Sequence, residues 1–257
     1  MDPITTWALL GVAAFGAGVL NAIAGGGSFL TFPALVFAGV PPIAANATSA
    51  LAVSPGYLGG VLGFRSELGA LPAALLRREV LISAIGGVCG ALLLLVTPPT
   101  LFSGLVPWLL LFATVLFAVG PRIARMAGGG AGLAAWRFPG LFLVAIYGGY
   151  FNGGLGILLM ALYTLTGEAR INTVNALKNL NSLVLSVLSV VAFAWAGAIV
   201  WHHAVLMMVA ATAISAASRQ TMAPAQAKAT TDSTDSTKEL RFFSALTVLM
   251  RLSPVRV

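Results

Sequence analysis

The sequence contains few charged residues and a single cysteine. Charged residues make up 8% of the 257 positions, whereas soluble domains carry about 25%. Cys89 stands alone, which excludes an internal disulfide, a CxxC redox centre and a cysteine-rich metal site. The segment 4–40 contains no Asp, Glu, Lys, Arg or His. With 59% hydrophobic residues, the chain is predicted to be an integral membrane protein without a separate soluble domain.

The sequence also lacks the motifs of common enzymes. No Gly-Lys-[Ser/Thr] follows the glycine-rich loop, and no GxGxxG order, nucleophile elbow or HExxH motif is present. We therefore expect no catalytic residue, no metal site and no cofactor. A net charge of +7 would suggest nucleic-acid binding in a soluble chain. Here the basic residues stand in short loops between apolar runs, as orientation signals do, so nucleic acid is not an expected partner.

Two of the apolar runs are interrupted by glycines. The run 4–39 contains three glycines at 25–27, and the run 139–165 contains a pair at 153–154. A continuous helix over the first run would be roughly 55 Å long, whereas the hydrocarbon core is about 30 Å thick. Glycine allows the backbone to turn without a Cβ clash, and unwound backbone at membrane depth survives only beside protein or a water-filled cavity. Two broken helices next to a polar cavity are therefore predicted.

Some loops contain basic residues and others contain none, and this difference predicts the membrane topology. Basic residues concentrate near 65–78, near 122–137 and after 218, whereas the loops near 98–99 and 201–203 have no Arg or Lys. Cytoplasmic placement of the basic loops satisfies the positive-inside rule if each broken run enters and returns as a hairpin. The remaining apolar segments are expected at 46–64, 80–97, 101–119, 174–198, 203–217 and, as a short one, 242–250.

An internal duplication is also predicted. The glycine pairs at 25–26 and 153–154 are 128 positions apart, and the Asn-Ala pairs at 46–47 and 175–176 are 129 apart, in the same order. The predicted fold is an all-α polytopic membrane protein with two homologous repeats, inverted if each broken run forms a hairpin and parallel if it crosses once. The expected organisation is a single membrane domain over 1–257, with repeat one at 1–120, a cytoplasmic linker at 121–138, repeat two at 139–217, and a divergent loop with a short apolar segment at 218–257.

Several of these blocks together resemble the TauE/SafE family of sulfite and organosulfur anion exporters. The resemblance covers about residues 5–210, beyond which the family's usual Gly-rich helix and last full span are replaced. It implies a multi-pass protein of the bacterial inner membrane that moves a small sulfur-containing anion outward, embedded in the lipid bilayer and compatible with a homodimer. The matching blocks are 21–33, 45–49, 107–114, 147–151 and 172–180.

Lys178 is the leading candidate for contact with an anion. It is the only lysine before position 228, and it stands a few residues inside an apolar helix. A charge within a span costs roughly 2.5–3.5 kcal/mol and normally faces the protein interior or a transport pathway. Asn175, Asn179 and Asn181 can donate amide hydrogen bonds, and most of this set shares one helix face with Ser182. The alternative is that Lys178 extends to the cytoplasmic interface.

Polar residues of the first half and of the two breaks complete the predicted site. Helices that start after the glycines would direct N–H groups and a positive dipole end toward an anion. Ser28 is expected to cap the first of these helices. The asparagines beside the breaks either hold the loops or touch the substrate. The further candidate positions are Asn46, Thr48, Ser49, Gly26, Gly27, Gly154, Asn21 and Asn152.

The other charged residues are expected at the surface. The segment 77–79 (Arg-Arg-Glu) is interpreted as a solvated cytoplasmic loop, which leaves no buried carboxylate to carry a proton. The membrane potential would then drive export. Glu168 and Arg170 are expected to pair loosely in a loop, and His202 and His203 to lie at the interface, with a proton-sensing role as the alternative. A passive anion channel or a membrane scaffold is the alternative to a transporter.

Overall fold

The protein is described here from a computed structural model that places residues 2–23, 26–126 and 133–212. Within these ranges the chain is helical and contains no strand. The chain divides into two compact units, Met1–Ser218 and Arg219–Val257. The second unit lies outside the described residues, as do Gly25 and the predicted segment 242–250.

The helices of the first half follow the predicted apolar segments. α3 starts at Pro42 after the extended residue Pro41, and α5 starts at Ala73 after the extended residue Pro72, because proline ends one element and favours the first turn of the next. The elements are α1 (Pro3–Ile23), α2 (Ser28–Phe37), α3 (Pro42–Gly63), the short α4 (Arg65–Gly69), α5 (Ala73–Val96) and α6 (Pro99–Met126).

The second half, like the first, begins with two helices, α7 and α8, that are separated by a break at glycines. A turn of 3-10 helix, η1 (Ala134–Trp136), leads into α7, and a last helical stretch at 201–212 follows α9. α6 continues to Met126 and α7 starts at Arg137, so helix occupies both ends of the segment 121–138 that was expected as a linker. The long elements are α7 (Arg137–Tyr150), α8 (Leu155–Leu165) and α9 (Ile171–Trp195).

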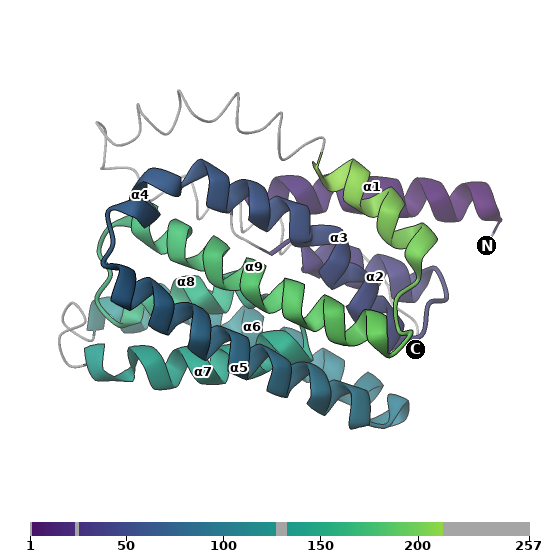
Figure 1. The fold of residues 1–257 in the computed structure, drawn as a ribbon. Helices are drawn as coiled ribbons and strands as arrows, with labels where there is room; N and C mark the ends of the chain where they lie inside the picture. Colours follow the sequence, from purple (N-terminus) through teal and green to yellow (C-terminus); the bar gives the residue numbers. More distant parts are fainter. Residues whose placement is uncertain (1, 24–25, 127–132, 213–257) are drawn as a thin grey trace. The chain divides into compact units, whose positions relative to one another are not determined.

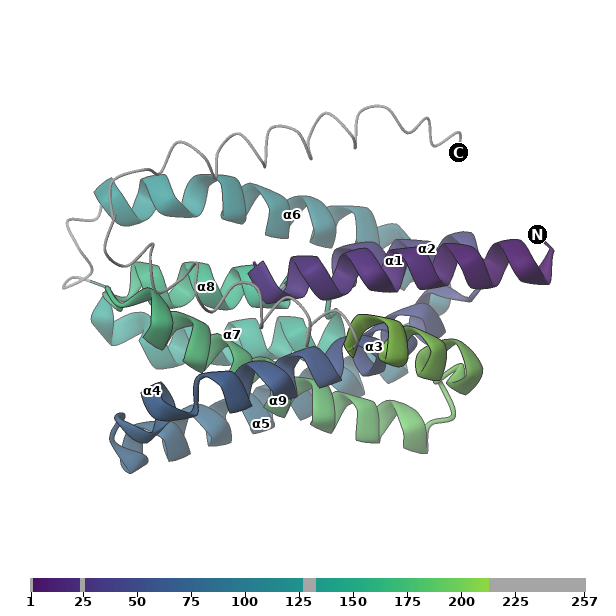
Figure 2. The same ribbon diagram turned by 90° about the horizontal axis from the view of Figure 1, so that it is seen from above.

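The two broken helices form hairpins that enter from opposite ends of the bundle. α1 starts at the end marked N, and α2 returns toward that end, whereas α7 and α8 have their outer ends at the opposite side (Figures 1 and 2). α2 and α8 have 10 and 11 residues and so reach only about 15 Å at 1.5 Å per residue, half of a bilayer core of about 30 Å. This geometry is the one that inverted repeats would produce, and the homology of the halves stays a prediction.

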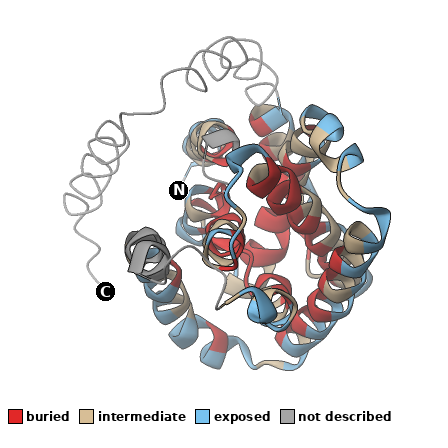
Figure 3. Ribbon diagram, turned by 90° about the vertical axis from the view of Figure 1, so that its left-hand side faces the viewer, coloured by how far each residue is buried: buried red, intermediate tan, exposed pale blue. Residues whose placement is uncertain are grey.

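The distribution of residue types across α5 identifies a lipid-facing helix. Its outer face carries Leu81, Ile85 and Leu92, each more than half exposed, whereas its buried face carries Glu79, Ser83 and several glycines. Buried residues gather on the inward faces of the bundle (Figure 3). Among the residues that the structure describes, three helices are long and apolar enough to span a membrane, at Pro3–Asn21, Ala73–Val96 and Ile171–Trp195. An apolar exterior with small and polar residues inside is the arrangement that a bilayer favours.

Glycines allow α5 and α7 to approach each other backbone to backbone. α5 packs most extensively against α7. A Cβ at Gly90 would overlap the carbonyl oxygen of Ile146 and the amide nitrogen of Tyr150, and a Cβ at Gly149 would overlap the carbonyl oxygen of Gly87. Small residues at helix contacts are the usual means of close packing within a membrane. This contact places the start of α5 beside the start of α7.

The first prediction concerns this contact. Gly90→Ala should lower the free energy of unfolding by about 1–3 kcal/mol, because the added methyl group meets backbone atoms that cannot rotate away. Gly104→Ala on α6 is the matched control, since a Cβ there has no neighbour within 4 Å. The measurement is unfolding of the purified protein by SDS titration in mixed micelles. Equal stability of the two variants would contradict the packing described here.

Candidate functional site

The tips of the two hairpins meet inside the bundle. A Cβ built at Gly26 would lie 3.4 Å from Cδ1 of Ile157 on α8, and one built at Gly154 would lie 2.9 Å from Cζ of Phe29 on α2. Gly154 has a φ of +80°, a conformation that glycine adopts without strain. The breaks that the sequence placed 128 positions apart are therefore in contact, as the hypothesis of a shared site requires.

Asn46 of α3 holds the second break in place. Its Nδ2 donates to the carbonyl oxygen of Tyr150 at 3.2 Å, and its Oδ1 accepts from the backbone N–H of Asn152 at 3.2 Å. The hydroxyl of Tyr147 donates to the carbonyl oxygen of Gly153 at 2.7 Å. Unwound backbone inside a membrane protein needs such partners, so Asn46 has a structural task that its predicted role as a substrate contact did not include.

The other two candidates on α3, Thr48 and Ser49, are also engaged in contacts between elements. Thr48 Oγ1 accepts from the backbone N–H of Val200 at 3.0 Å. Ser49 Oγ and Thr31 Oγ1 are 2.6 Å apart and hydrogen-bonded. Both side chains are fully buried on α3, so they lie in the interior as predicted. Their hydroxyls join α3 to α2 and to the chain before the last helical stretch.

The second-half candidates on α9 are buried but lack such partners. Lys178 is 1% exposed and Asn179 is 6% exposed, while Asn175 is half-buried. The structure gives no hydrogen bond or ion pair to any of these three side chains among the residues it describes. Asn179 packs on α3, because a Cβ at Gly60 would meet its side-chain amide. A lysine that reached the interface would expose its ammonium group, so the buried position of Lys178 favours the interior interpretation over snorkelling.

Other buried polar atoms near the breaks have no hydrogen-bond partner within the described part of the chain. These include Oδ1 of Asn21, Oγ of Ser28, the hydroxyl of Tyr57 and both amide atoms of Asn152. Ser28 does not cap α2 as predicted, because the helix begins at Ser28 itself with Gly27 as the capping position. Its side chain lies near the Tyr57 hydroxyl on α3. A buried polar group left without a partner costs about 1–3 kcal/mol, so such groups call for an explanation.

The largest correction to the sequence analysis concerns Glu79. The segment 77–79 does not form a solvated loop but lies in the second turn of α5, and Glu79 is fully buried. A carboxylate is therefore present inside the protein, contrary to expectation. Arg77 and Arg78 remain exposed on the other side of the helix, where Arg78 stacks on the ring of Phe138 at 3.9 Å.

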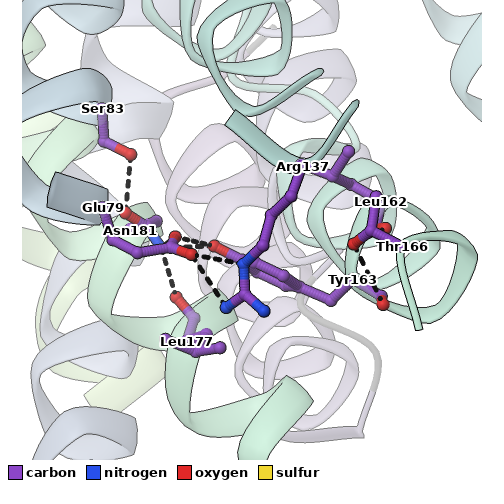
Figure 4. Close-up of polar contacts among 8 residues, drawn as sticks. All are labelled: Glu79, Ser83, Arg137, Leu162, Tyr163, Thr166, Leu177 and Asn181. Atoms are coloured by element: carbon purple, nitrogen blue, oxygen red, sulfur yellow. Dashed lines mark hydrogen bonds and ion pairs between the residues drawn. The ribbon is translucent and has the colours of Figure 1, made fainter. Parts of the chain in front are cut away.

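Glu79 is the centre of a hydrogen-bonded network that joins four helices (Figure 4). Arg137 of α7 donates through Nε to Oε1 at 2.9 Å and forms the ion pair. The hydroxyl of Tyr163 on α8 and Nδ2 of Asn181 on α9 donate to Oε2 at 2.5 and 3.0 Å. Ser83, one turn along α5, donates to Oδ1 of Asn181 at 2.6 Å. Both carboxylate oxygens thus accept hydrogen bonds, and Oε1 is also paired with the guanidinium group of Arg137.

A sequence signal could have placed Glu79 in a helix. Pro72 precedes an uninterrupted helical pattern, and proline followed by good helix formers marks a helix start. From that start, Glu79, Ser83 and Gly86 recur at helical spacing on one face, together with Gly90. The hydropathy pattern instead begins the apolar run after Glu79, because two arginines and the glutamate depress the average there.

The remaining charged candidates lie at the periphery. Glu168 and Arg170 form a pair at 4.0 Å, loose as predicted, and the Arg170 side chain is 71% exposed. His202 is exposed, and its ring lies 6.2 Å from that of Trp7 on α1. Among the described residues, no group of three or more His, Cys, Asp and Glu side chains could hold a metal ion.

Comparison with known proteins identifies relatives of this chain. The family described as sulfite exporter TauE/SafE matches residues 10–229. The probable membrane transporter protein ORF9 of Sinorhizobium sp. is 30% identical over 207 residues, covering 78% of this chain and 77% of the relative. The probable membrane transporter protein of Haemophilus influenzae is 29% identical, with 78% and 79% covered. The probable membrane transporter protein YfcA of Escherichia coli K12 is 29% identical, covering 78% of this chain and 76% of the relative. No solved structure matches the chain.

The second prediction concerns the network around Glu79. Glu79→Leu should lower the free energy of unfolding by about 3–5 kcal/mol, because Arg137 is left as a partly buried charge without its partner. The double variant Glu79→Leu with Arg137→Leu should lose less than the sum of the two single changes. Both are measured by SDS titration.

The matched control for this cycle is Glu67→Leu on α4, whose carboxylate bonds Ser66 at an exposed position. Its stability should stay close to that of the unchanged protein. Additive losses in the double variant would show that Glu79 and Arg137 do not stabilise each other.

Proposed function

The chain belongs to the TauE/SafE sulfite exporter family, and from this premise we propose that it is a secondary transporter that exports a small sulfur oxyanion or organosulfonate across a bacterial inner membrane. Membrane transport follows from the family and from the apolar helices. The proposal adds the class of substrate, the direction of transport and the residues that hold the anion.

The observation that carries the proposal is the buried ammonium group of Lys178. It lies on a helix of spanning length and is 1% exposed, and it forms no ion pair with the described residues. An unpaired charge within a membrane protein is costly and marks a pathway or a ligand. A small oxyanion offers a countercharge and several acceptor oxygens. Asn179 and Asn175 on the same helix supply amide donors beside the ammonium.

The starts of α2 and α8 add a positive dipole end that suits an anion. Neither helix start has a side-chain cap among the described residues, with Gly27 and Gly154 in the capping positions. The backbone N–H groups of Phe29, Leu30 and Leu155 donate to carbonyl oxygens of the turns before them, so the contribution of these helix starts is mainly electrostatic. Since the hairpin tips meet, both positive ends lie in the same part of the bundle. We place the anion between these tips and α9, with Asn21, Ser28 and Asn152 as further polar contacts.

The membrane potential is sufficient to drive this export. Both carboxylate oxygens of Glu79 are occupied by donors from three other helices, which gives this group a structural task. Moving one negative charge out of a cell that is negative inside gains about 2.3 kcal/mol per 100 mV. Export of a sulfur oxyanion therefore needs no titrating carboxylate.

A carrier fits the described conformation better than a passive channel. An open channel would leave its charged residue in contact with water on both sides. Lys178 is instead enclosed by the protein. Two hairpins that enter from opposite ends and meet at the centre also suit alternating access, in which one part of the protein moves against another around a fixed site.

The third prediction concerns Lys178. In proteoliposomes loaded with sulfite, Lys178→Gln should weaken the apparent affinity for the anion by about 10- to 100-fold. The reason is that a hydrogen bond to a charged group contributes about 1.5–3 kcal/mol. Arg77→Gln is the matched control, because it removes a positive charge from the exposed face of α5 and should leave the affinity unchanged.

Parallel assays with thiosulfate, sulfoacetate and taurine identify the preferred substrate. A folded Lys178→Gln protein with unchanged affinity would remove Lys178 from the site. Flux of many unrelated anions at channel rates would show a passive pore. Absence of flux for every anion in the panel, with the unchanged protein correctly inserted, would reject the proposed substrate class.

A further inference from the structure

Many hydroxyl side chains on the helices of this protein bond their own backbone. On exposed or half-buried helix surfaces, the hydroxyl donates to the carbonyl oxygen four residues earlier, which satisfies it locally in a membrane environment. This group comprises Ser54, Thr97, Ser103, Thr114, Thr164 and Thr212. A hydroxyl on a helix of this protein therefore has an available partner in its own backbone.

Three serines of α9 do not use that partner. Ser182, Ser186 and Ser189 are at most 2% exposed. Their Oγ atoms have no hydrogen-bond partner within the described part of the chain. A backbone carbonyl lies one turn earlier in each case, but the serine hydroxyls do not bond it in this structure. They keep their hydrogen-bonding capacity in the protein interior.

The three serines continue the helix face that carries Lys178. At 100° per residue, positions 178, 182, 186 and 189 fall within an arc of about 80°. The stripe extends over eleven residues, or about 16 Å of helix axis, roughly half of the hydrocarbon thickness. It starts near the end of the bundle where α4 and the starts of α5 and α9 lie, and it leads toward the opposite end (Figure 1).

Neighbouring residues show which sides of α9 are already occupied. Asn181 bonds Ser83, and Leu185 fills the space beside Gly87, so this side faces α5. Asn179 packs on Gly60, so the next side faces α3. Val187 is 48% exposed on the outer surface. The serine stripe therefore runs between the α3 contact and the α5 contact, away from lipid.

From this geometry we propose that Ser182, Ser186 and Ser189 line the route by which the anion moves along α9 after leaving Lys178. The inference rests on the proposed export function and names the residues that follow the binding site. Hydroxyl groups donate hydrogen bonds to an oxyanion without adding a charge, so each contact is weak enough to be exchanged for the next. In the described conformation the route is closed, and it opens during the transport cycle.

Cysteine accessibility tests this route directly, because the chain has one native cysteine. In a Cys89→Ser background, Ser182→Cys, Ser186→Cys and Ser189→Cys are nearly isosteric changes that keep the packing. The probe is sulfonatoethyl methanethiosulfonate, itself a small organosulfonate anion. All three cysteines should react with this probe in vesicles. Val187→Cys is the matched control on the same helix, and it should not react because it faces lipid.

Sulfoacetate should slow the reaction severalfold, since it competes for the route and, unlike sulfite, does not attack the probe. Failure of all three cysteines to react in protein that elutes as a single folded species would overturn the route. Reaction no faster than that of Val187→Cys would do the same. Reaction without protection by any anion of the panel, and without flux, would support the route while rejecting the sulfur-anion exporter.

Alanine substitution supplies an independent readout. The combined variant Ser182→Ala, Ser186→Ala and Ser189→Ala should reduce maximal sulfite efflux severalfold with a smaller effect on apparent affinity, since Lys178 is retained. Ser103→Ala on α6 removes a hydroxyl that bonds its own helix and serves as the control. Unchanged efflux in the triple variant would contradict the proposal.

Discussion

The burial of one carboxylate, Glu79, is the constraint on which the packing of α5, α7, α8 and α9 depends. An ionised carboxylate is tolerated in a low-dielectric interior only when it is paired and hydrogen-bonded. Glu79 meets this condition with Arg137, Tyr163 and Asn181, one from each of the three partner helices. The glycine contact between α5 and α7 brings these groups within reach. A single side chain of the first half thereby anchors the helices of the second half.

The two halves use their polar residues differently. In the first half, Asn46, Thr48 and Ser49 bond the second break, the chain before the last helical stretch, and α2. On α9 the side chains of Lys178 and Ser182 are buried without such bonds to the described residues. Buried polar groups are normally satisfied, and those that are not point to a ligand or a moving part. The proposed anion site therefore uses the unbonded polar groups on α9 and at the hairpin tips.

The hairpin tips and α9 are held by contacts of different kinds. At the tips, Gly26 lies against the side chain of Ile157 and Gly154 against that of Phe29, which are apolar contacts. α9 is fixed at Asn181 by the network of Glu79, on the side that faces α5. A firm anchor on one side and exchangeable contacts on the other would let the protein open around the anion without losing the position of Lys178.

Hydropathy alone determined the membrane class and the approximate bounds of the apolar helices, because it is averaged over neighbouring residues. The glycines within two apolar runs marked the two breaks. Neither inference needs knowledge of the fold. Lys178 is likewise marked by the amino-acid order alone, because it is a lone charge within an apolar run. Tertiary structure decided that Glu79 faces inward and that Asn46 holds the second break. The partners of Glu79 lie 58 to 102 positions away in the chain, and those of Asn46 lie more than 100 away. Whether a polar side chain meets lipid, water or a partner depends on such distant contacts, which no local pattern contains.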